Sequence, residues 1–224
     1  MLSIILPAYR EKGNLALLIP RITHELGSRS FEIIVVDDNS GDGTEELVST
    51  IASSDRRVRL LKRDGKRGLA SAIADGAALS KGEHLLVMDA DLSHPSEKIN
   101  ELVGALASAD LAVGSRNLPG GGVSNWPLER KAVSSGATLL ARLFIGTRIS
   151  DPMSGFFAVK REVFMRTRLR VKGYKILLNL LADNKGMKVA EVPYVFRDRF
   201  NGKTKLGASE MVSYLFDIIR IRLG

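Results

Sequence analysis

The chain has 224 residues, 45% of them hydrophobic, which is enough to bury a substantial core. It contains no cysteine, so disulfides and thiolate metal sites are excluded. The formal net charge of +8 and the pI near 9.8 favour anionic partners, namely nucleotide diphosphates, nucleic acid or an anionic lipid surface. No apolar run approaches the roughly 20 residues that span a bilayer, so the chain as given is expected to be soluble.

Short apolar segments alternate with amphipathic segments along the first half of the chain. The predicted strands cover residues 2–6, 31–36, 58–61, 84–88 and 111–113. The predicted helices lie between them, at residues 14–26, 43–52, 69–79 and 96–107. This alternation predicts an α/β fold with right-handed βαβ units and a mostly parallel, Rossmann-like sheet that carries helices on both faces.

The pattern changes after residue 114. A glycine-rich loop at 118–123 precedes a long amphipathic segment at 127–145, and an irregular turn follows at 151–155. A further strand is predicted at 189–195 and a last amphipathic helix at 208–222. No linker-like run of proline and glycine divides the chain, so we expect one domain.

Polar residues follow most of the predicted strands. In an open parallel sheet, ligands bind beyond the carboxyl ends of the strands. The segments found there are PAYRE (7–11), DDNSGDGT (37–44), DAD (89–91) and SR (115–116). Carboxylates accept hydrogen bonds from ribose hydroxyls and hold hard cations, and arginine pairs with phosphate. The sequence therefore predicts a metal-diphosphate site at this edge of the sheet.

Asp89 and Asp91 carry the metal hypothesis. They follow an apolar strand, and their alternation puts both carboxylates on the same side of an extended chain, where Mg²⁺ or Mn²⁺ can bridge them to a diphosphate. Such a pair between a strand and a helix is more often a turn and N-cap device, so the neighbouring motifs must decide. Asp42 and Thr44 are predicted to cap a helix, and His94 to shape its loop rather than to bind metal.

The order of the motifs resembles that of the family 2 glycosyltransferases with the GT-A fold. The motifs that carry this resemblance are PAYRE (7–11), VVDDNSGDGT (35–44), GLASA (68–72) and MDADLSHP (88–95). Three later motifs look like those of the dolichol-phosphate (polyprenyl-phosphate) mannosyltransferases: VGSR (113–116), DPMSGFFAV (151–159) and RFNGKTK (199–205). The resemblance covers nearly the whole chain. It implies a single catalytic domain, 1–224, with a nucleotide-sugar half of about 1–116 and an acceptor half of about 117–224.

The resemblance implies an enzyme that transfers mannose from GDP-mannose to a dolichyl or polyprenyl phosphate by an inverting displacement, with Mg²⁺ or Mn²⁺ as cofactor. Transfer of glucose from UDP-glucose is the enzymatic alternative on the same fold. A basic nucleic-acid-binding module is the alternative of a different class, but the chain lacks the motifs that would support it, so no nucleic acid is expected. The lipid acceptor implies a peripheral position on the cytoplasmic face of a membrane, with a possible membrane-anchoring subunit.

The same resemblance assigns roles to individual residues. The implied nucleotide-sugar site consists of Pro7, Tyr9, Glu11, Val36, Asp38, Asp89, Ala90, Asp91, Arg116, Arg199 and Lys205. The implied metal ligands are Asp89, Asp91 and Ser93. The implied acceptor site consists of Arg130, Lys131, Ser134 and Asp151. The implied catalytic residues are Asp91, Arg116 and Arg199.

Overall fold

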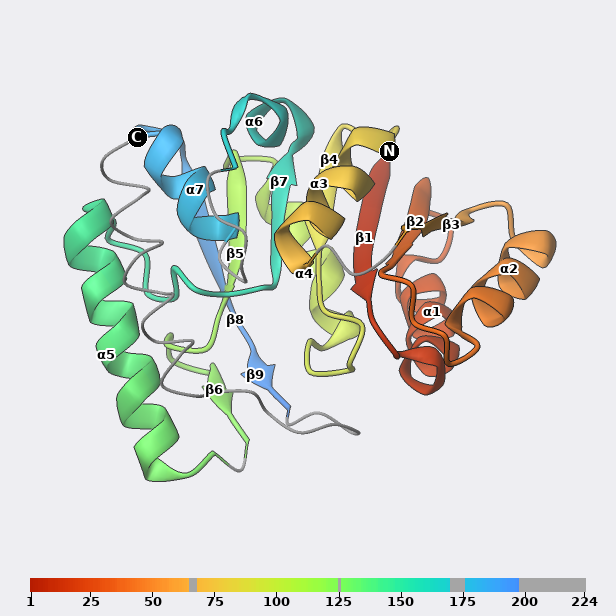
Figure 1. Ribbon diagram of the computed structural model, residues 1–224. Coiled ribbons are helices and arrows are strands. Elements are labelled where there is room, and N and C mark those ends of the chain that lie inside the picture. The colour runs from red at the N-terminus through yellow and green to blue at the C-terminus, as the bar shows by residue number, and fades with distance from the viewer. Residues whose placement is uncertain (65–67, 125, 170–175, 198–224) are drawn as a thin grey trace.

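A computed structural model describes residues 1–64, 68–124, 126–169 and 176–197 (Figure 1). Its strands are β1 (Leu2–Ala8), β2 (Phe31–Asp37), β3 (Val58–Lys62), β4 (His84–Val87), β5 (Leu111–Ser115), β6 (Gly122–Val123), β7 (Phe157–Lys160), β8 (Val189–Pro193) and β9 (Val195–Phe196). Its helices are α1 (Lys12–Leu26), α2 (Thr44–Ser54), α3 (Leu69–Leu79), η1 (Ser96–Lys98), α4 (Ile99–Ala105), α5 (Leu128–Ile145), α6 (Arg161–Arg166) and α7 (Ile176–Asp183).

Seven strands form the main sheet, in the order β3-β2-β1-β4-β7-β5-β8. Neighbouring strands pair in parallel except at β7, which runs antiparallel to both β4 and β5. Strands β6 and β9 form a separate parallel pair. The predicted mostly parallel sheet is therefore confirmed.

Side chains of the central strands alternate between two buried clusters, because successive residues of a strand point to opposite faces. Ile4 and Leu6 belong to the cluster that packs against α1, α2 and α4. Ile5 and Val36 belong to the cluster that packs against α3, α6 and α7. Helices thus cover both faces of the sheet, as the pattern predicts.

Two helices begin where the sequence places a turn residue. Asp42 accepts hydrogen bonds from the backbone N–H and the hydroxyl of Thr44, at 3.0 Å and 2.6 Å, and so satisfies one of the unpaired N–H groups at the start of α2. Helix α3 follows Gly68, whose φ of 93° favours glycine. Asp42 thus supports the start of α2, but the N-cap residue itself is Gly43, and Thr44 is the first residue of the helix.

The structure differs from the sequence prediction mainly in its second half. The sequence pattern does not predict strand β7 or helices α6 and α7, because each has only four to eight residues, too few for a clear periodic pattern. The segment predicted as a helix at 96–107 begins as η1 and continues as α4. The helix predicted at 208–222 lies outside the described residues. Among the residues that are described, none of the helices is both long and apolar enough to cross a membrane.

Candidate active site

The loops that carry the predicted site residues lie together at one edge of the molecule. In Figure 1 the parallel strands run downward, so the loops after β1, β2, β4 and β5 gather along the lower part of the sheet, near β6 and β9. Three of these loops contain a non-glycine residue with positive φ: Arg10 at 62°, Asn39 at 57° and Leu92 at 65°. Such conformations are uncommon and concentrate at functional sites.

The loop after β1 places the predicted nucleoside residues beside the end of β2. Pro7 is paired in register with Val36, and both are buried. Tyr9 is 38% exposed. Glu11 stands at the start of α1 and accepts a hydrogen bond from the side chain of Asn14 at 2.6 Å. The structure therefore brings these four predicted residues to one corner of the sheet edge.

Asp38 is held in a buried ion pair that the sequence did not reveal. The Nε of Arg63 lies 2.6 Å from Asp38 Oδ1, and both side chains are less than one tenth exposed. Asp38 Oδ2 also accepts from the backbone N–H of Gly68 at 3.0 Å. The neighbouring Asp37 accepts hydrogen bonds from the backbone N–H and the hydroxyl of Ser40, which hold this loop in place.

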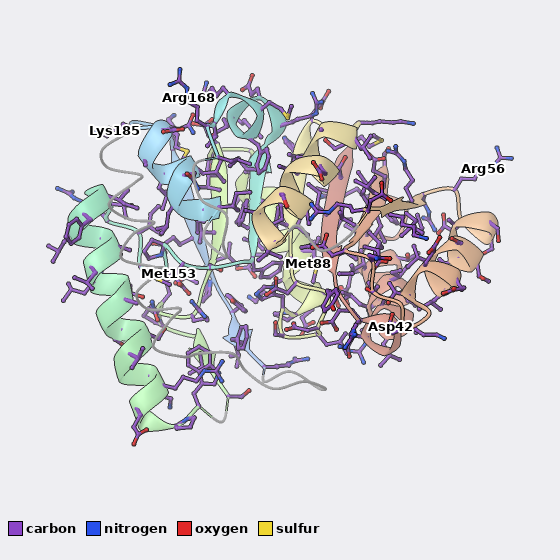
Figure 2. All side chains as sticks on the ribbon, in the orientation of Figure 1. Asp42, Arg56, Met88, Met153, Arg168 and Lys185 are labelled. Carbon is purple, nitrogen blue, oxygen red and sulfur yellow. The ribbon has the colours of Figure 1, made fainter. Side chains whose placement is uncertain are left out.

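Arg63 belongs to a basic run, 56–67, that from sequence reads equally well as a solvated surface or an anion site. The structure divides the run: Arg56 points into solvent at the far end of the molecule (Figure 2), whereas Arg63 is buried. A sequence signal for Arg63 does exist. It directly follows the last residue of β3, so the rule that strand ends carry the site, applied to the third strand as well, singles it out.

The Asp-x-Asp loop follows β4, just beyond Met88, which Figure 2 labels near the centre of the molecule. Asp91 is buried, and its Oδ1 accepts from the backbone N–H of Ser93 at 3.1 Å across Leu92, which closes a tight turn. The side chain of Asp89 stays 31% exposed. The loop thus combines a fixed carboxylate with one that solvent reaches.

His94 fastens this loop to the core. Its Nδ1 accepts from the backbone N–H of Asp89 at 3.0 Å, and its ring stacks on Phe156 with centroids 5.0 Å apart. Burial lowers the pKa of His94 to about 4, so the ring is neutral near pH 7 and carries its proton on Nε2. With Nδ1 engaged and Nε2 protonated, His94 offers no lone pair to a metal, in agreement with its predicted role in shaping the loop.

The donor set of this loop fits a small, hard cation. Among the described residues, no group of three or more His, Cys, Asp or Glu side chains forms a protein-only metal site. Mg²⁺ and related cations are instead bound by one or two carboxylates together with water and substrate phosphates. Asp89 and Asp91 can provide the two carboxylates. The hydroxyl of Ser93 is buried and has no hydrogen-bond partner among the described residues. This orphaned oxygen is consistent with its predicted place in the metal site.

Arg116 and Asp151 form a bidentate ion pair at the site. Arg116 donates from Nε and Nη2 to the two carboxylate oxygens, at 2.7 Å and 2.8 Å, and from its backbone N–H at 3.1 Å. Asp151 is fully buried. Burial lowers the pKa of Arg116, but the hydrogen bonds and charge of Asp151 outweigh burial and raise it. This bidentate contact with the buried carboxylate fixes the orientation of the Arg116 guanidinium.

The predicted acceptor residues other than Asp151 lie on the first two turns of α5. Arg130 places its guanidinium 3.7 Å from the ring centroid of Trp126, and Ser134 lies one turn later on the same side of the helix. Lys131 is exposed. The predicted residues Arg199 and Lys205 lie outside the described residues.

The family model described as "Glycosyl transferase family 2" matches residues 3–168 of this chain. This span includes the loops after β1, β2, β4 and β5 and the turn that contains Asp151. The chain therefore belongs to the family 2 glycosyltransferases, and it is a glycosyltransferase.

The relatives narrow the assignment. A dolichol-phosphate mannosyltransferase of Pyrococcus furiosus is 41% identical over 98% of this chain, which spans 63% of the length of that protein. A dolichol-phosphate mannosyltransferase of Saccharomyces cerevisiae is 37% identical over 95% of this chain and 84% of its own length. A polyprenol monophosphomannose synthase of Mycolicibacterium smegmatis is 39% identical over 96% of this chain and 84% of its own length. Within the family, this chain groups with the dolichol-phosphate mannosyltransferases.

Solved structures confirm the GT-A fold. Glucosyl-3-phosphoglycerate synthase from Mycobacterium tuberculosis, in complex with Mn²⁺, UDP and glucosyl-3-phosphoglycerate, superimposes with a TM-score of 0.70 over 100% of this chain and 78% of that one. The two chains are 22% identical, so the likeness concerns the fold alone.

Proposed function

We propose that this chain transfers mannose from GDP-mannose to a polyprenyl phosphate such as dolichyl phosphate. The observation that carries the proposal is the convergence, at one sheet edge, of the Asp89 and Asp91 carboxylates with Arg116, which Asp151 fixes. The names of the relatives support the mannosyl group and the lipid acceptor. The named relatives give no comparable support to transfer of glucose from UDP-glucose.

The charges explain how such a site would work. Asp89 and Asp91 would hold Mg²⁺ or Mn²⁺, which when bound neutralises the diphosphate of the donor. Arg116 would donate to the same diphosphate, because Asp151 engages only Nε and Nη2 and leaves Nη1 outside the ion pair. These positive groups stabilise the charge that grows on the leaving nucleotide.

The displacement requires no strong base. An oxygen of the lipid phosphate forms a bond to the anomeric carbon while the bond from that carbon to the diphosphate oxygen breaks, which inverts the configuration and releases GDP. A phosphate monoester has a second pKa near about 6, so it is largely ionised at neutral pH and has no proton to lose. We therefore assign Asp151 to the orientation of Arg116 and not to proton transfer.

A donor and acceptor panel tests the proposal. The chain would be incubated with labelled GDP-mannose or UDP-glucose and with polyprenyl phosphates of several lengths, with Mn²⁺ or with a chelator. We expect mannose to reach the lipid only when the cation is present. In calorimetry, GDP should bind more tightly than UDP, since a site that hydrogen-bonds one base leaves polar groups unpaired with the other. Labelled glucose on the lipid, without mannose, would replace the mannosyl assignment by the glucosyl one.

The lipid acceptor also bears on where the protein acts. We propose that it works at a membrane surface, as a peripheral protein on the cytoplasmic face, with a separate anchoring subunit as a possible partner. The net charge of +8 supports attraction to anionic lipids. The outer face of α5 adds exposed leucines at Leu139 and Leu143.

A further inference from the structure

The only tryptophan of the chain contacts two arginines that the proposed function assigns to different phosphates. Trp126 lies between β6 and α5. The Cζ of Arg130, on α5, is 3.7 Å from the centroid of its ring, and the Cζ of Arg116, at the end of β5, is 5.8 Å away. Both distances fall within the roughly 6 Å over which an aromatic face attracts a cation. The indole of Trp126 therefore lies against both the arginine proposed for the donor diphosphate, Arg116, and the arginine proposed for the acceptor phosphate, Arg130.

Other rings fix the position of Trp126. Its ring meets Phe196 edge-on, with centroids 5.6 Å apart, and the backbone N–H of Ser124 donates to the carbonyl of Phe196 at 2.9 Å. Phe196 in turn meets His94 edge-on at 5.8 Å. Since His94 accepts from the backbone of Asp89, a chain of ring contacts runs from Trp126 to the Asp-x-Asp loop.

The two guanidinium groups are restrained in different ways. Asp151 holds one edge of the Arg116 guanidinium through two hydrogen bonds. The ring centroids of Trp126 and Phe196 each lie 5.8 Å from the Cζ of Arg116. Arg130 rests on the indole at close range. A planar guanidinium that is already held on a ring loses less conformational freedom when it binds a phosphate.

We propose that Trp126 is a positioning residue that holds Arg116 and Arg130 as one preorganised unit, so that the diphosphate of the donor and the phosphate of the acceptor are received side by side. This inference rests on the proposed function, which assigns Arg116 to the diphosphate and Arg130 to the lipid phosphate. The ring acts through these two guanidinium groups. A phosphate bound to Arg130 changes the contact between that guanidinium and the indole.

Intrinsic fluorescence tests this inference directly, because Trp126 is the only indole that can emit. The wild-type protein would be titrated with farnesyl phosphate, a short polyprenyl phosphate, and with farnesol, which has the same chain without the phosphate. We expect a saturable change of emission with farnesyl phosphate and none with farnesol. Arg130→Ala should abolish the change, whereas the exposed neighbour Glu129 serves as the control, since Glu129→Gln should preserve it.

Kinetics separate positioning from simple packing. Trp126→Leu removes the aromatic face, so we expect the Michaelis constant for farnesyl phosphate to rise about tenfold, with a smaller rise for GDP-mannose. Trp126→Phe keeps an aromatic face, so its Michaelis constants for both substrates should stay within about threefold of the wild-type values.

Two results would overturn the inference. The first is a wild-type emission that does not respond to farnesyl phosphate. The second is an equal loss toward both substrates in Trp126→Leu, with a lowered thermal midpoint and no recovery in Trp126→Phe, which would assign the ring to packing alone. Failure of the wild-type protein to transfer mannose to any lipid would instead reject the proposed function, and the titration would still report whether a phosphate reaches the ring.

Discussion

The aspartates at the carboxyl edge of the sheet differ in their contacts and in their exposure to solvent. Asp37 accepts from Ser40, Asp42 supports the start of α2, and Asp151 gives both oxygens to Arg116. In the Asp-x-Asp loop, the side chain of Asp89 remains 31% exposed. Because solvent reaches Asp89 and the buried Asp91 lies two residues further on, the Asp-x-Asp loop is the best place for a cation.

Replacing Asp91 by Asn should nearly abolish transfer while the fold survives. The substitution keeps the size of the side chain and removes the charge that would hold the cation against the diphosphate. Loss of a critical electrostatic group typically lowers turnover by about 10²- to 10³-fold. The measurement is kcat at saturating donor over a range of Mn²⁺ concentrations, with circular dichroism as the check on folding.

Asp42 provides the matched control, since it lies at the same edge but supports the start of a helix. Asp42→Asn should retain most turnover and its normal dependence on Mn²⁺. If Asp91→Asn behaved in the same way, the assignment of the Asp-x-Asp loop to the metal would be wrong.

Arg63→Met should destabilise the protein and weaken donor binding. The substitution leaves the Asp38 carboxylate buried without its cation, a change that typically costs about 3–5 kcal/mol. Thermal unfolding should therefore show a lower midpoint, and the Michaelis constant for GDP-mannose should rise more than that for the lipid. Arg56→Met is the control, because that side chain points into solvent (Figure 2). An unchanged midpoint in Arg63→Met would show that the ion pair adds nothing to stability.

The sequence predicts which residues reach the site more reliably than it predicts their partners. Strand ends identify Asp38, Asp89 and Arg116, because a parallel sheet brings those ends to one edge. Arg116 and Asp151 are 35 positions apart in the chain, and Asp151 lies in a turn that has no periodic pattern. Nothing local in the sequence therefore specifies that they pair. The strand-end rule identifies Arg63 but not its partners, because its guanidinium donates to Ser71 and Asp75 of α3, later in the chain.

At the level of the elements, Glu32 links β2 to three neighbouring segments. Its carboxylate accepts from the hydroxyl of Ser3 at 2.7 Å, from the backbone of Lys81 at 2.6 Å and from Arg59 at 2.7 Å. Burial raises the pKa of Glu32, but these hydrogen bonds outweigh burial and leave the pKa below its usual 4.5. A carboxylate whose pKa is lowered by folding stabilises the fold at pH values above its pKa in the unfolded chain. This contribution is lost as the pH falls from that value through the lower pKa of the folded protein.

Glu32→Gln should therefore lower the stability at pH 7 by about 1–3 kcal/mol, the usual cost of losing charged hydrogen-bond partners. The difference from wild type should shrink as the pH falls below about 4.5, where the unfolded chain takes up the proton first. Denaturant unfolding at a series of pH values measures this, with Glu46→Gln on the exposed side of α2 as the control. A difference that stayed constant with pH would contradict the assignment.

Helix α5 presents an apolar outer face between basic residues. Leu139 is 58% exposed and Leu143, one turn later, is 67% exposed, while Lys131 and Arg142 are exposed on the flank of this face. On its other side the helix packs through Ala137 and Ala141 against Leu178 of α7. Exposed leucines flanked by cations are typical of a helix that lies against an anionic membrane.

Replacing Leu139 and Leu143 together by serine should reduce binding to vesicles that contain anionic lipid. Each leucine removed from the interface forfeits about 1.5–3 kcal/mol of apolar burial at most, so co-sedimentation should fall several-fold or more. Leu79→Ser, which changes an exposed leucine at the end of α3, should leave binding unchanged. Equal binding by the double variant would assign this face to a protein partner or to none.

For the molecule as a whole, the first half follows from its sequence pattern more fully than the second half, where the pattern predicts α5 and β8 but not β7. Apolar strands that alternate with amphipathic helices predict that β1 to β5 run in the same direction, because right-handed βαβ crossovers join parallel strands. Strand β7 has four residues, follows an irregular turn, and pairs with strands far away in the chain. Its place depends on the gap between β4 and β5, which only the folded sheet creates.

The insertion of β7 has a consequence for dissecting the protein. It comes from the part of the chain after residue 116, yet it fills the gap between two strands that come before that point. A fragment ending near residue 116 would keep the Asp-x-Asp loop but would leave the backbone of His84–Val87 and of Leu111–Ser115 without the ladder that β7 supplies. Unpaired apolar strand edges recruit strands from other molecules, so such a fragment should aggregate instead of serving as an isolated nucleotide-binding module.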